Sequence, residues 1–332
     1  MNEESVEQPE SADARLRQRA AEGEPDWSAM TAEELAAFSE AENRRRASPA
    51  ARAVTGTPHP GATIAWQELG LPGRILPVRV YRPAFEHNGG GADPAALPLV
   101  LHVHGGGFVG TAVQSDWVNS HLAAELPALV VSVEHRLLAP GTPLSAAADD
   151  GWDALHHLVR NAADWGFDPA RIAVFGESCG ALITALAAIR ARAAGPRLRA
   201  QVLVNPAVDL TETMLDHASV AEHPASPTLT VPQLRLFHRL AVPPGADPRA
   251  LSPLHAADLG GLAPALAVVP TDDPLADHGR RYAERLRAAG TPARLTEYPG
   301  APHAFLSMPG LVPQAEAARA EIIDFLRGAL AG

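Results

Sequence analysis

The sequence predicts an α/β fold with a mostly parallel, doubly wound sheet. Its 332 residues suffice for a large core or about two domains. Short, nearly continuous Val, Ile and Leu runs alternate with longer helical stretches, a pattern typical of strands buried on both faces. The predicted strands are 63–71 and 75–82, joined by a turn at Leu71-Pro72-Gly73, followed by 97–105, 128–136, 171–177, 200–208, 264–272 and 293–299.

The helical segments follow from capping signals and from the spaces between these strands. Residues 12–21 and 31–46 predict two helices in a polar N-terminal region, and Thr31 with Glu34 forms a capping box. The segment 209–250 is too long for a plain connection and is rich in His, Pro and Thr, so we expect an inserted cap. A Gly-rich loop is expected at 87–93. The longer segments between the strands are predicted to be helices, such as 145–164, 178–194 and 277–289.

Composition excludes several function classes. The net charge of −11 argues against nucleic acid or an anionic membrane as the main partner. All 27 basic residues are Arg, which excludes chemistry that needs a lysine, such as a Schiff base or a Walker A loop. Cys179 is the one cysteine, so neither an internal disulfide nor a cysteine metal site is expected. With no signal-peptide pattern and no run of 18 apolar residues, we expect a soluble cytoplasmic protein without membrane insertion.

The sharpest motif is G-x-S-x-G, written G-E-S-C-G at 176–180, between a predicted strand and a predicted helix. In that context the motif is typical of a nucleophile elbow, which lifts a serine above the edge of the sheet. Gly176 and Gly180 are needed because side chains there would clash with the neighbouring elements. The motif predicts Ser178 as a nucleophile, with Glu177 as a hydrogen-bonding support for the elbow.

A serine nucleophile needs a base, and the base needs an acid to orient it. The chain order expected here is Ser, acid, His. Asp272 and Asp273 follow one predicted strand, and His303 follows the next. Both places lie past the C-terminal ends of strands, where ligand sites of open α/β sheets gather. These residues predict a triad of Ser178, His303 and either Asp272 or Asp273.

The run H-V-H-G-G-G-F at 102–108 follows the first long predicted strand. Successive glycines leave backbone N–H groups unobstructed, as binding of a tetrahedral oxyanion requires. We expect the N–H groups of Gly106, Gly107 and Cys179 to form the oxyanion hole, supported by His104 and Gly105. The pairs at 102/104 and 156/157 show no third ligand at metal spacing, so no metal site is expected.

Together these motifs resemble the bacterial hormone-sensitive-lipase-like (family IV) esterases of the α/β-hydrolase fold. The resemblance implies that Asp273, directly before Pro-Leu, is the triad acid. It also implies a helical cap made of residues 1–55 and 209–245, over a hydrolase core made of 56–208 and 246–332. The resemblance runs from about Trp66 to the C-terminus and includes V-R-V-Y-R-P (78–83), H-G-G-G-F (104–108), G-E-S-C-G (176–180), S-P-L (252–254), D-P-L-A-D (273–277), Y-A-E-R-L-R (282–287) and His303.

Two motifs depart from the family pattern. The elbow reads G-E-S-C-G-A where the family commonly has G-D-S-A-G-G, and the segment 135–140 reads H-R-L-L-A-P where the family has Y-R-L-A-P-E. Both changes leave the triad intact. The shape of the pocket wall and the substrate range are where we expect a difference from the family.

The resemblance implies hydrolysis of short- to medium-chain carboxylic esters through an acyl-enzyme on Ser178, with no metal or organic cofactor. A deacetylase, amidase or lactonase specific for one metabolite would use the same triad, with its specificity in 209–245. A plant hormone receptor similar to this family binds without hydrolysis, but it has lost the triad His, which is present here. The resemblance also makes the edge strand at 294–298 a candidate for homodimer formation.

Overall fold

The computed structural model describes residues 25–84 and 97–331 and contains an eight-stranded sheet in the order β1-β2-β4-β3-β5-β6-β9-β10. β2 runs antiparallel to both of its neighbours, and the strands from β4 to β10 are parallel. The predicted mostly parallel, doubly wound sheet is confirmed. The strands are β1 (Ala62–Leu71), β2 (Arg74–Pro83), β3 (Leu97–Val103), β4 (Leu129–Val133), β5 (Phe167–Glu177), β6 (Ala200–Val204), β9 (Ala265–Asp272) and β10 (Ala293–Pro302).

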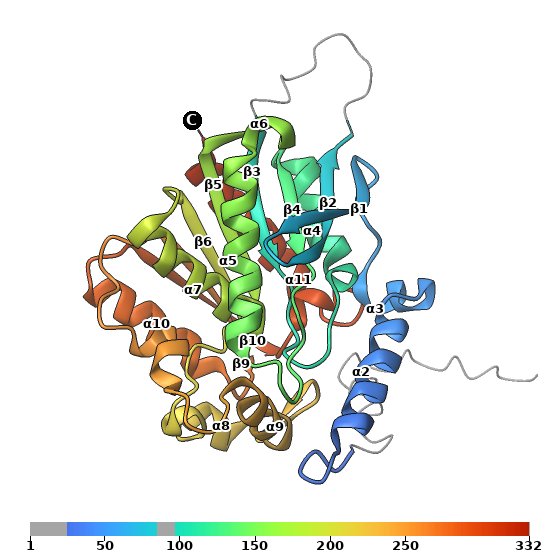
Figure 1. The fold of residues 1–332 in the computed structure, drawn as a ribbon, viewed down its shortest axis with the longest axis vertical. Helices are drawn as coiled ribbons and strands as arrows, with labels where there is room; N and C mark the ends of the chain where they lie inside the picture. Colours follow the sequence, from blue (N-terminus) through green and yellow to red (C-terminus); the bar gives the residue numbers. More distant parts are fainter. Residues whose placement is uncertain (1–24, 85–96, 332) are drawn as a thin grey trace, which may run out of the picture.

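Helices cover both faces of the sheet, as Figure 1 shows. One face packs on α5 (Leu144–Arg160), α7 (Cys179–Ala194) and α10 (Ala276–Ala288), the other on α4 (Asp116–Glu125) and α11 (Gln314–Leu330). Leu99 and Leu101 of β3 join the first core and Val100 the second. Since both faces of β3 are buried, the strand needs an unbroken apolar sequence. None of the helices in the described ranges is long and apolar enough to cross a membrane.

Several boundaries differ from the predicted ones. β3, β4 and β6 end earlier than predicted because their last predicted residues belong to loops that line or support the site. The predicted helix 145–164 is two helices, α5 and α6 (Ala162–Trp165), with a break at Asn161, whose side-chain amide donates to the His157 carbonyl. Helix α4 lies between two predicted strands, where a helix was expected without stated bounds, and α11 follows the last predicted strand, where none was predicted. The predicted helix 12–21 and Gly-rich loop 87–93 lie outside the described residues.

Two segments far apart in sequence lie together near the end of the sheet where Ser178 is found (Figure 1). The N-terminal one contains α2 (Ala32–Arg46), which begins at the predicted capping box of Thr31 and Glu34, and α3 (Arg52–Thr55). The second contains α8 (Ala218–Glu222) and α9 (Val231–Ala241). They are joined by Arg239, whose Nη2 donates to the Trp27 carbonyl at 2.8 Å. The remaining short elements are η1 (Pro49–Ala51), η3 (Ala112–Ser115), η4 (Glu212–Leu215), β7 (Ala225–Ser226), β8 (Leu229–Thr230), η5 (Pro248–Leu251), η6 (Pro253–His255) and η7 (Phe305–Ser307).

The second segment is anchored at its base by Asp209, which is fully buried. Its carboxylate accepts hydrogen bonds from the Thr211 and Thr213 hydroxyls at 2.7 and 2.9 Å and lies 3.4 Å from His217 Nε2. Burial opposes ionisation, but the bonds from His217 and Thr211 outweigh it and hold the Asp209 pKa below its usual range. A buried anion with several donors fixes the path of the chain at this point.

Helix α7 crosses β3 at very close range. A Cβ on Gly180 would lie 2.1 Å from the Val103 carbonyl oxygen and 2.5 Å from that of His104. Both obstacles are backbone atoms, so the helix could accept a side chain here only by moving away from the sheet.

We expect Gly180→Ala to lower the free energy of unfolding by about 2 kcal/mol or more, because α7 must shift off β3. Gly328→Ala is the matched control: Gly328 lies in the exposed part of α11, where an added Cβ meets nothing within 4 Å. That change should raise stability by about 0.5–1 kcal/mol, since alanine favours helix over glycine. Urea unfolding of both variants measures the difference, and equal effects would contradict the close crossing.

Candidate active site

Ser178 occupies the turn between β5 and α7, with φ of 53° and ψ of −117°. Non-glycine residues rarely adopt positive φ, and such a conformation costs about 1–3 kcal/mol. Its N–H donates to the Val204 carbonyl at 2.9 Å, and its carbonyl accepts from Leu182 at 3.1 Å. A Cβ on Gly176 would lie 2.3 Å from the Gly180 carbonyl oxygen, so the turn closes only with glycine there. These contacts hold the Ser178 hydroxyl at the surface of a cavity.

Ser178, His303 and Asp273 form a continuous hydrogen-bonded series. His303 Nε2 lies 2.8 Å from Ser178 Oγ, and Nδ1 lies 2.8 Å from Asp273 Oδ2. Asp273 is fully buried, and its Oδ1 accepts from the Leu275 N–H at 2.8 Å. Asp272, the other acid that the residues left open, is exposed and accepts from the Thr271 hydroxyl. The geometry therefore places Asp273, as the family resemblance implied, against the imidazole.

Two side-chain hydrogen bonds, neither predicted from the sequence, hold the loop that contains His303 and Ser307 in place. Thr228 Oγ1 donates to the His303 carbonyl at 2.6 Å, and Ser307 Oγ donates to Glu177 Oε2 at 2.8 Å. Glu177 was expected to support the elbow, but its bonded partner is the segment that carries the histidine. It thereby ties the strand before Ser178 to the loop after His303. No sequence signal pairs these residues, because 130 positions separate Glu177 from Ser307.

The glycine run after β3 lines the same cavity as Ser178. Gly106 has φ of 96°, and a Cβ there would lie 1.7 Å from the Val109 carbonyl oxygen, so only glycine fits this turn. The Gly105 carbonyl accepts from Gln114 Nε2 at 3.1 Å, and Gln114 Oε1 in turn accepts from Arg46 Nη1 at 3.0 Å. The structure thus brings the predicted oxyanion glycines beside Ser178 and adds two polar supports that sequence reasoning missed.

Cys179 is the first residue of α7, and its side chain is buried. Burial raises the pKa of its thiol to about 12, so the thiolate form is negligible near neutral pH. The backbone N–H remains the relevant group at this position, because the first N–H groups of a helix have no partner within the helix.

His104 supports the glycine run from within the core. Its Nδ1 donates to the Gly105 carbonyl at 3.0 Å, and its ring stacks on His135 with centroids 4.3 Å apart. Burial, and then the neighbouring His135, lower the pKa of His104 well below its usual value. The ring is therefore neutral at pH 7.

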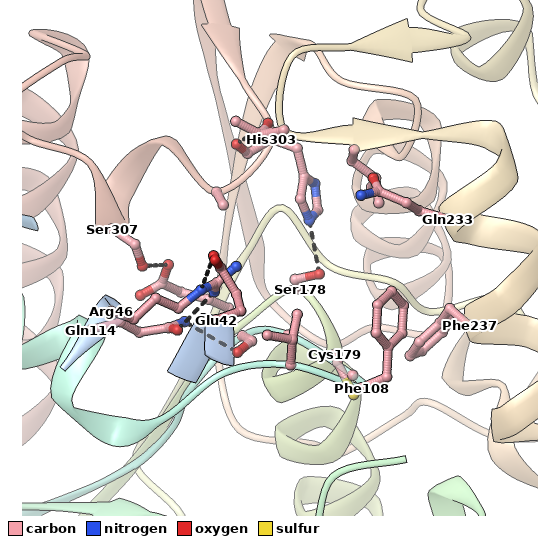
Figure 2. Close-up of a pocket in the computed structure, with 18 of the residues that line it drawn as sticks. Glu42, Arg46, Phe108, Gln114, Ser178, Cys179, Gln233, Phe237, His303 and Ser307 are labelled. Carbon is pink, nitrogen blue, oxygen red and sulfur yellow. Dashed lines mark hydrogen bonds and ion pairs between the residues drawn. The ribbon is translucent and has the colours of Figure 1, made fainter. Parts of the chain in front are cut away.

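The cavity around Ser178 has a volume of about 440 Å³. In Figure 2, Phe108 and Phe237 lie on one side of Ser178, and Arg46, Glu42 and Gln114 lie on the other. An apolar arm of the cavity, with Phe108 and Phe237, and a polar arm, with Arg46, Glu42 and Gln114, thus meet at Ser178. Other lining residues include Trp27, Phe38, Val54, Thr55, Asn205, Leu229, Gln233, Leu234, Leu275 and Met308.

The one group of possible metal ligands found in the described ranges lies elsewhere. His59, His121 and Glu125 have ligand atoms within 4.8 Å of one another, but none of them lines the cavity. His102 Nδ1 is 2.8 Å from Ser132 Oγ and 3.1 Å from Asn119 Nδ2, which gives that ring a packing role.

Buried histidines make stability depend on pH. Burial, and then His217, lower the pKa of His278 to about 4, and burial also lowers the pKa values of His102 and His135. A depressed histidine pKa contributes stability that is fully present above about pH 6.5 and is lost as the pH falls toward 4, because the unfolded chain takes up the proton first. His278 alone accounts for about 3 kcal/mol over that interval.

We therefore expect the free energy of unfolding, measured with urea, to fall between pH 6.5 and 4.5. His278→Asn should flatten this dependence, while the same change at exposed His156 should leave it as in the wild type. A stability independent of pH over this interval would contradict the buried neutral histidines.

The chain resembles known proteins along most of its length. A family model described as alpha/beta hydrolase fold matches residues 100–307. The carboxylesterase NlhH of Mycobacterium tuberculosis is 38% identical over 264 residues, covering 77% of this chain and 79% of that protein. An ethyl acetate hydrolase of Pseudomonas putida is 35% identical over the same shares of the two chains.

Solved structures agree with these relatives. A hyperthermophilic esterase from the archaeon Pyrobaculum calidifontis superposes with a TM-score of 0.82 at 29% identity, covering 95% of this chain and 96% of that one. The thermophilic carboxylesterase EstE1, cloned from a metagenomic library, has a TM-score of 0.79 at 30% identity, covering 92% and 99% of the two chains.

Proposed function

The chain belongs to the hormone-sensitive-lipase-like esterases of the α/β-hydrolase fold and is a carboxylic ester hydrolase; we propose that Ser178, His303 and Asp273 carry out the reaction. The observation that carries the proposal is the unbroken series from Ser178 Oγ through both His303 nitrogens to Asp273, with 2.8 Å at each step. A nucleophile within hydrogen-bond reach of a base, itself oriented by an acid, is the arrangement that acyl transfer requires.

In the first half of the reaction, His303 Nε2 takes the proton of Ser178 Oγ as that oxygen attacks the ester carbonyl carbon. The carbonyl oxygen becomes an oxyanion, which the N–H groups of Gly106, Gly107 and Cys179 bind. Asp273 keeps the Nδ1 proton on the imidazole and stabilises the imidazolium. The intermediate then collapses: the bond to the alcohol oxygen breaks, and the imidazolium gives its proton to the leaving alcohol.

In the second half, water enters the site of the departed alcohol. His303 removes a proton from this water, the resulting oxygen nucleophile attacks the acyl carbon, and a second oxyanion forms in the same hole. Collapse returns the proton to Ser178 Oγ and releases the carboxylic acid. No step draws on a group outside the chain, apart from the ester and water.

We also propose the division into a cap made of residues 1–55 and 209–245 and a core made of 56–208 and 246–332. Supporting it, Trp27 and Phe38 from the first cap segment and Leu234 and Phe237 from the second line the cavity above Ser178. The apolar arm suits a short- to medium-chain acyl group. A cytoplasmic location and a homodimer stay predictions from the sequence.

We expect Ser178→Ala to reduce kcat on p-nitrophenyl esters by about three decades or more while the fold is retained. The matched control is Cys179→Ala, which removes the neighbouring thiol but keeps the backbone N–H. That variant should stay within about tenfold of the wild type. A Ser178→Ala protein with wild-type turnover, or a Cys179→Ala protein as inactive as Ser178→Ala, would overturn the assignment.

Phe237 is expected to limit acyl length. A Cβ on Gly107 would lie 2.4 Å from the Phe237 ring, which shows how closely the ring covers the glycine run. Phe237→Ala opens this space, so the ratio of kcat/KM for the octanoate ester to that for the acetate ester should rise by about tenfold. The ratio is measured within one protein preparation, and an unchanged or lowered ratio would place the acyl group elsewhere.

A further inference from the structure

A second cavity, with a volume of about 290 Å³, lies beside the active-site cavity. Arg46 and Thr55 belong to the walls of both. The other lining residues come from the segment 47–58, from Trp66 and Arg79 on the first two strands, and from Val113 and Asp116. None of the triad residues takes part.

The charge of this second cavity is opposite to that of the whole chain. Arg46, Arg52 and Arg79 line it with one acid, Asp116. Since Arg46 is also paired with Glu42, three positive and two negative charges give a formal sum of +1. The whole chain has a formal net charge of −11 at pH 7. A concave site with reversed sign attracts ligands that the rest of the surface repels.

Two of the arginines are held in fixed positions. Arg79 donates to the Asp116 carboxylate through Nε at 2.5 Å and Nη2 at 2.8 Å, and the Tyr81 hydroxyl donates to the same carboxylate. Arg46 donates through Nε to Glu42 and through Nη1 to Gln114. A guanidinium has five N–H groups, so these bonds leave donors on both side chains for a ligand.

Arg52 supplies the uncompensated charge. It is exposed in the first turn of α3, and the described part of the structure gives its side chain no acidic partner. The cavity also contains Trp66, a half-exposed ring (47%) whose centroid lies 5.1 Å from Arg79 Cζ. The ring and Asp116 limit how far the Arg79 guanidinium can move.

We propose that the second cavity is a binding site for an oxyanion, a phosphate or a carboxylate group, with Arg52 as its main ligand. Guanidinium groups bind such anions through paired, charge-assisted N–H bonds, and the two fixed arginines provide a preorganised wall. The cavity is larger than a phosphate ion, so it also admits the anionic end of a larger molecule. Because Arg46 lies in both walls, the bound anion sits next to the active-site cavity.

The anion has two conceivable sources with the same chemistry. It is either a free ion or an anionic substituent on the ester itself, which would then extend from Ser178 toward Arg46. Binding of the anion does not require ester hydrolysis, so it can be tested on a variant that does not hydrolyse esters.

The binding test is calorimetric titration of inorganic phosphate into the full-length Ser178→Ala protein, at an ionic strength held constant with sodium chloride. We expect saturable binding of phosphate to the Ser178→Ala protein. The double variant with Arg52→Gln should have an affinity at least tenfold lower. The matched control is Arg44→Gln on α2, which removes the same charge from an exposed side chain that lines neither cavity. It should bind as tightly as the parent, and urea unfolding checks that all three proteins are equally folded.

No saturable binding, unchanged binding in Arg52→Gln, or an equal loss in Arg44→Gln would overturn the proposal. Where binding holds, the source of the anion is identified by the kinetics of the single variant Arg52→Gln, which keeps Ser178, compared with the wild type. A lower kcat/KM of Arg52→Gln for mono-p-nitrophenyl adipate, but not for neutral p-nitrophenyl hexanoate, assigns the anion to the substrate. If Arg52→Gln has the same kcat/KM as the wild type for each of the two esters, the bound anion is a free ion. Hydrolysis of the hexanoate continues in either case, so failure of the anion site leaves the proposed function intact.

Discussion

The site depends on one tight turn, the crossing from β5 to α7 at Ser178. Its positive φ is a strained conformation, and it persists because the surrounding backbone leaves no alternative. Gly176 and Gly180 approach neighbouring carbonyl oxygens too closely for any side chain, and the Ser178 N–H is bonded to Val204. The turn places the Ser178 hydroxyl above the sheet edge, where the residues after β9 and β10 bring Asp273 and His303.

Those groups come from segments that are distant in sequence and are held by bonds between loops. Thr228, from the inserted segment, donates to the His303 carbonyl, and Ser307 donates to Glu177, the residue before Ser178. From the N-terminal side, Asn43 Oδ1 accepts from the Gly110 N–H at 2.8 Å, next to the glycine run. The two segments over the cavity therefore do more than cover it, because each also fixes a loop of the proposed catalytic site.

The parts that sequence could predict are those with local signals. The apolar runs gave the strands, and G-x-S-x-G between a strand and a helix located Ser178, because both patterns are written in neighbouring residues. The residues alone could not choose between Asp272 and Asp273, since that choice depends on which carboxylate points inward at the end of β9. The hydrogen bonds of Glu177 with Ser307 and of Arg46 with Gln114 could not be predicted from the sequence. Such pairs arise from tertiary packing and have no periodicity. The terminal helix α11 was not predicted, because it follows the last strand and no alternation of strands and helices indicates it.

The central claim is that Ser178 is the nucleophile activated by His303. Its most direct test is reaction with a p-nitrophenyl alkylphosphonate, in which the attacking oxygen bonds to phosphorus and p-nitrophenolate leaves. We predict one p-nitrophenolate per chain, with the phosphonyl mass on the peptide that contains Ser178. We also predict a rate lower by about two decades or more in His303→Ala. A label on another residue such as Cys179, or folded protein that releases no p-nitrophenolate, would contradict the account.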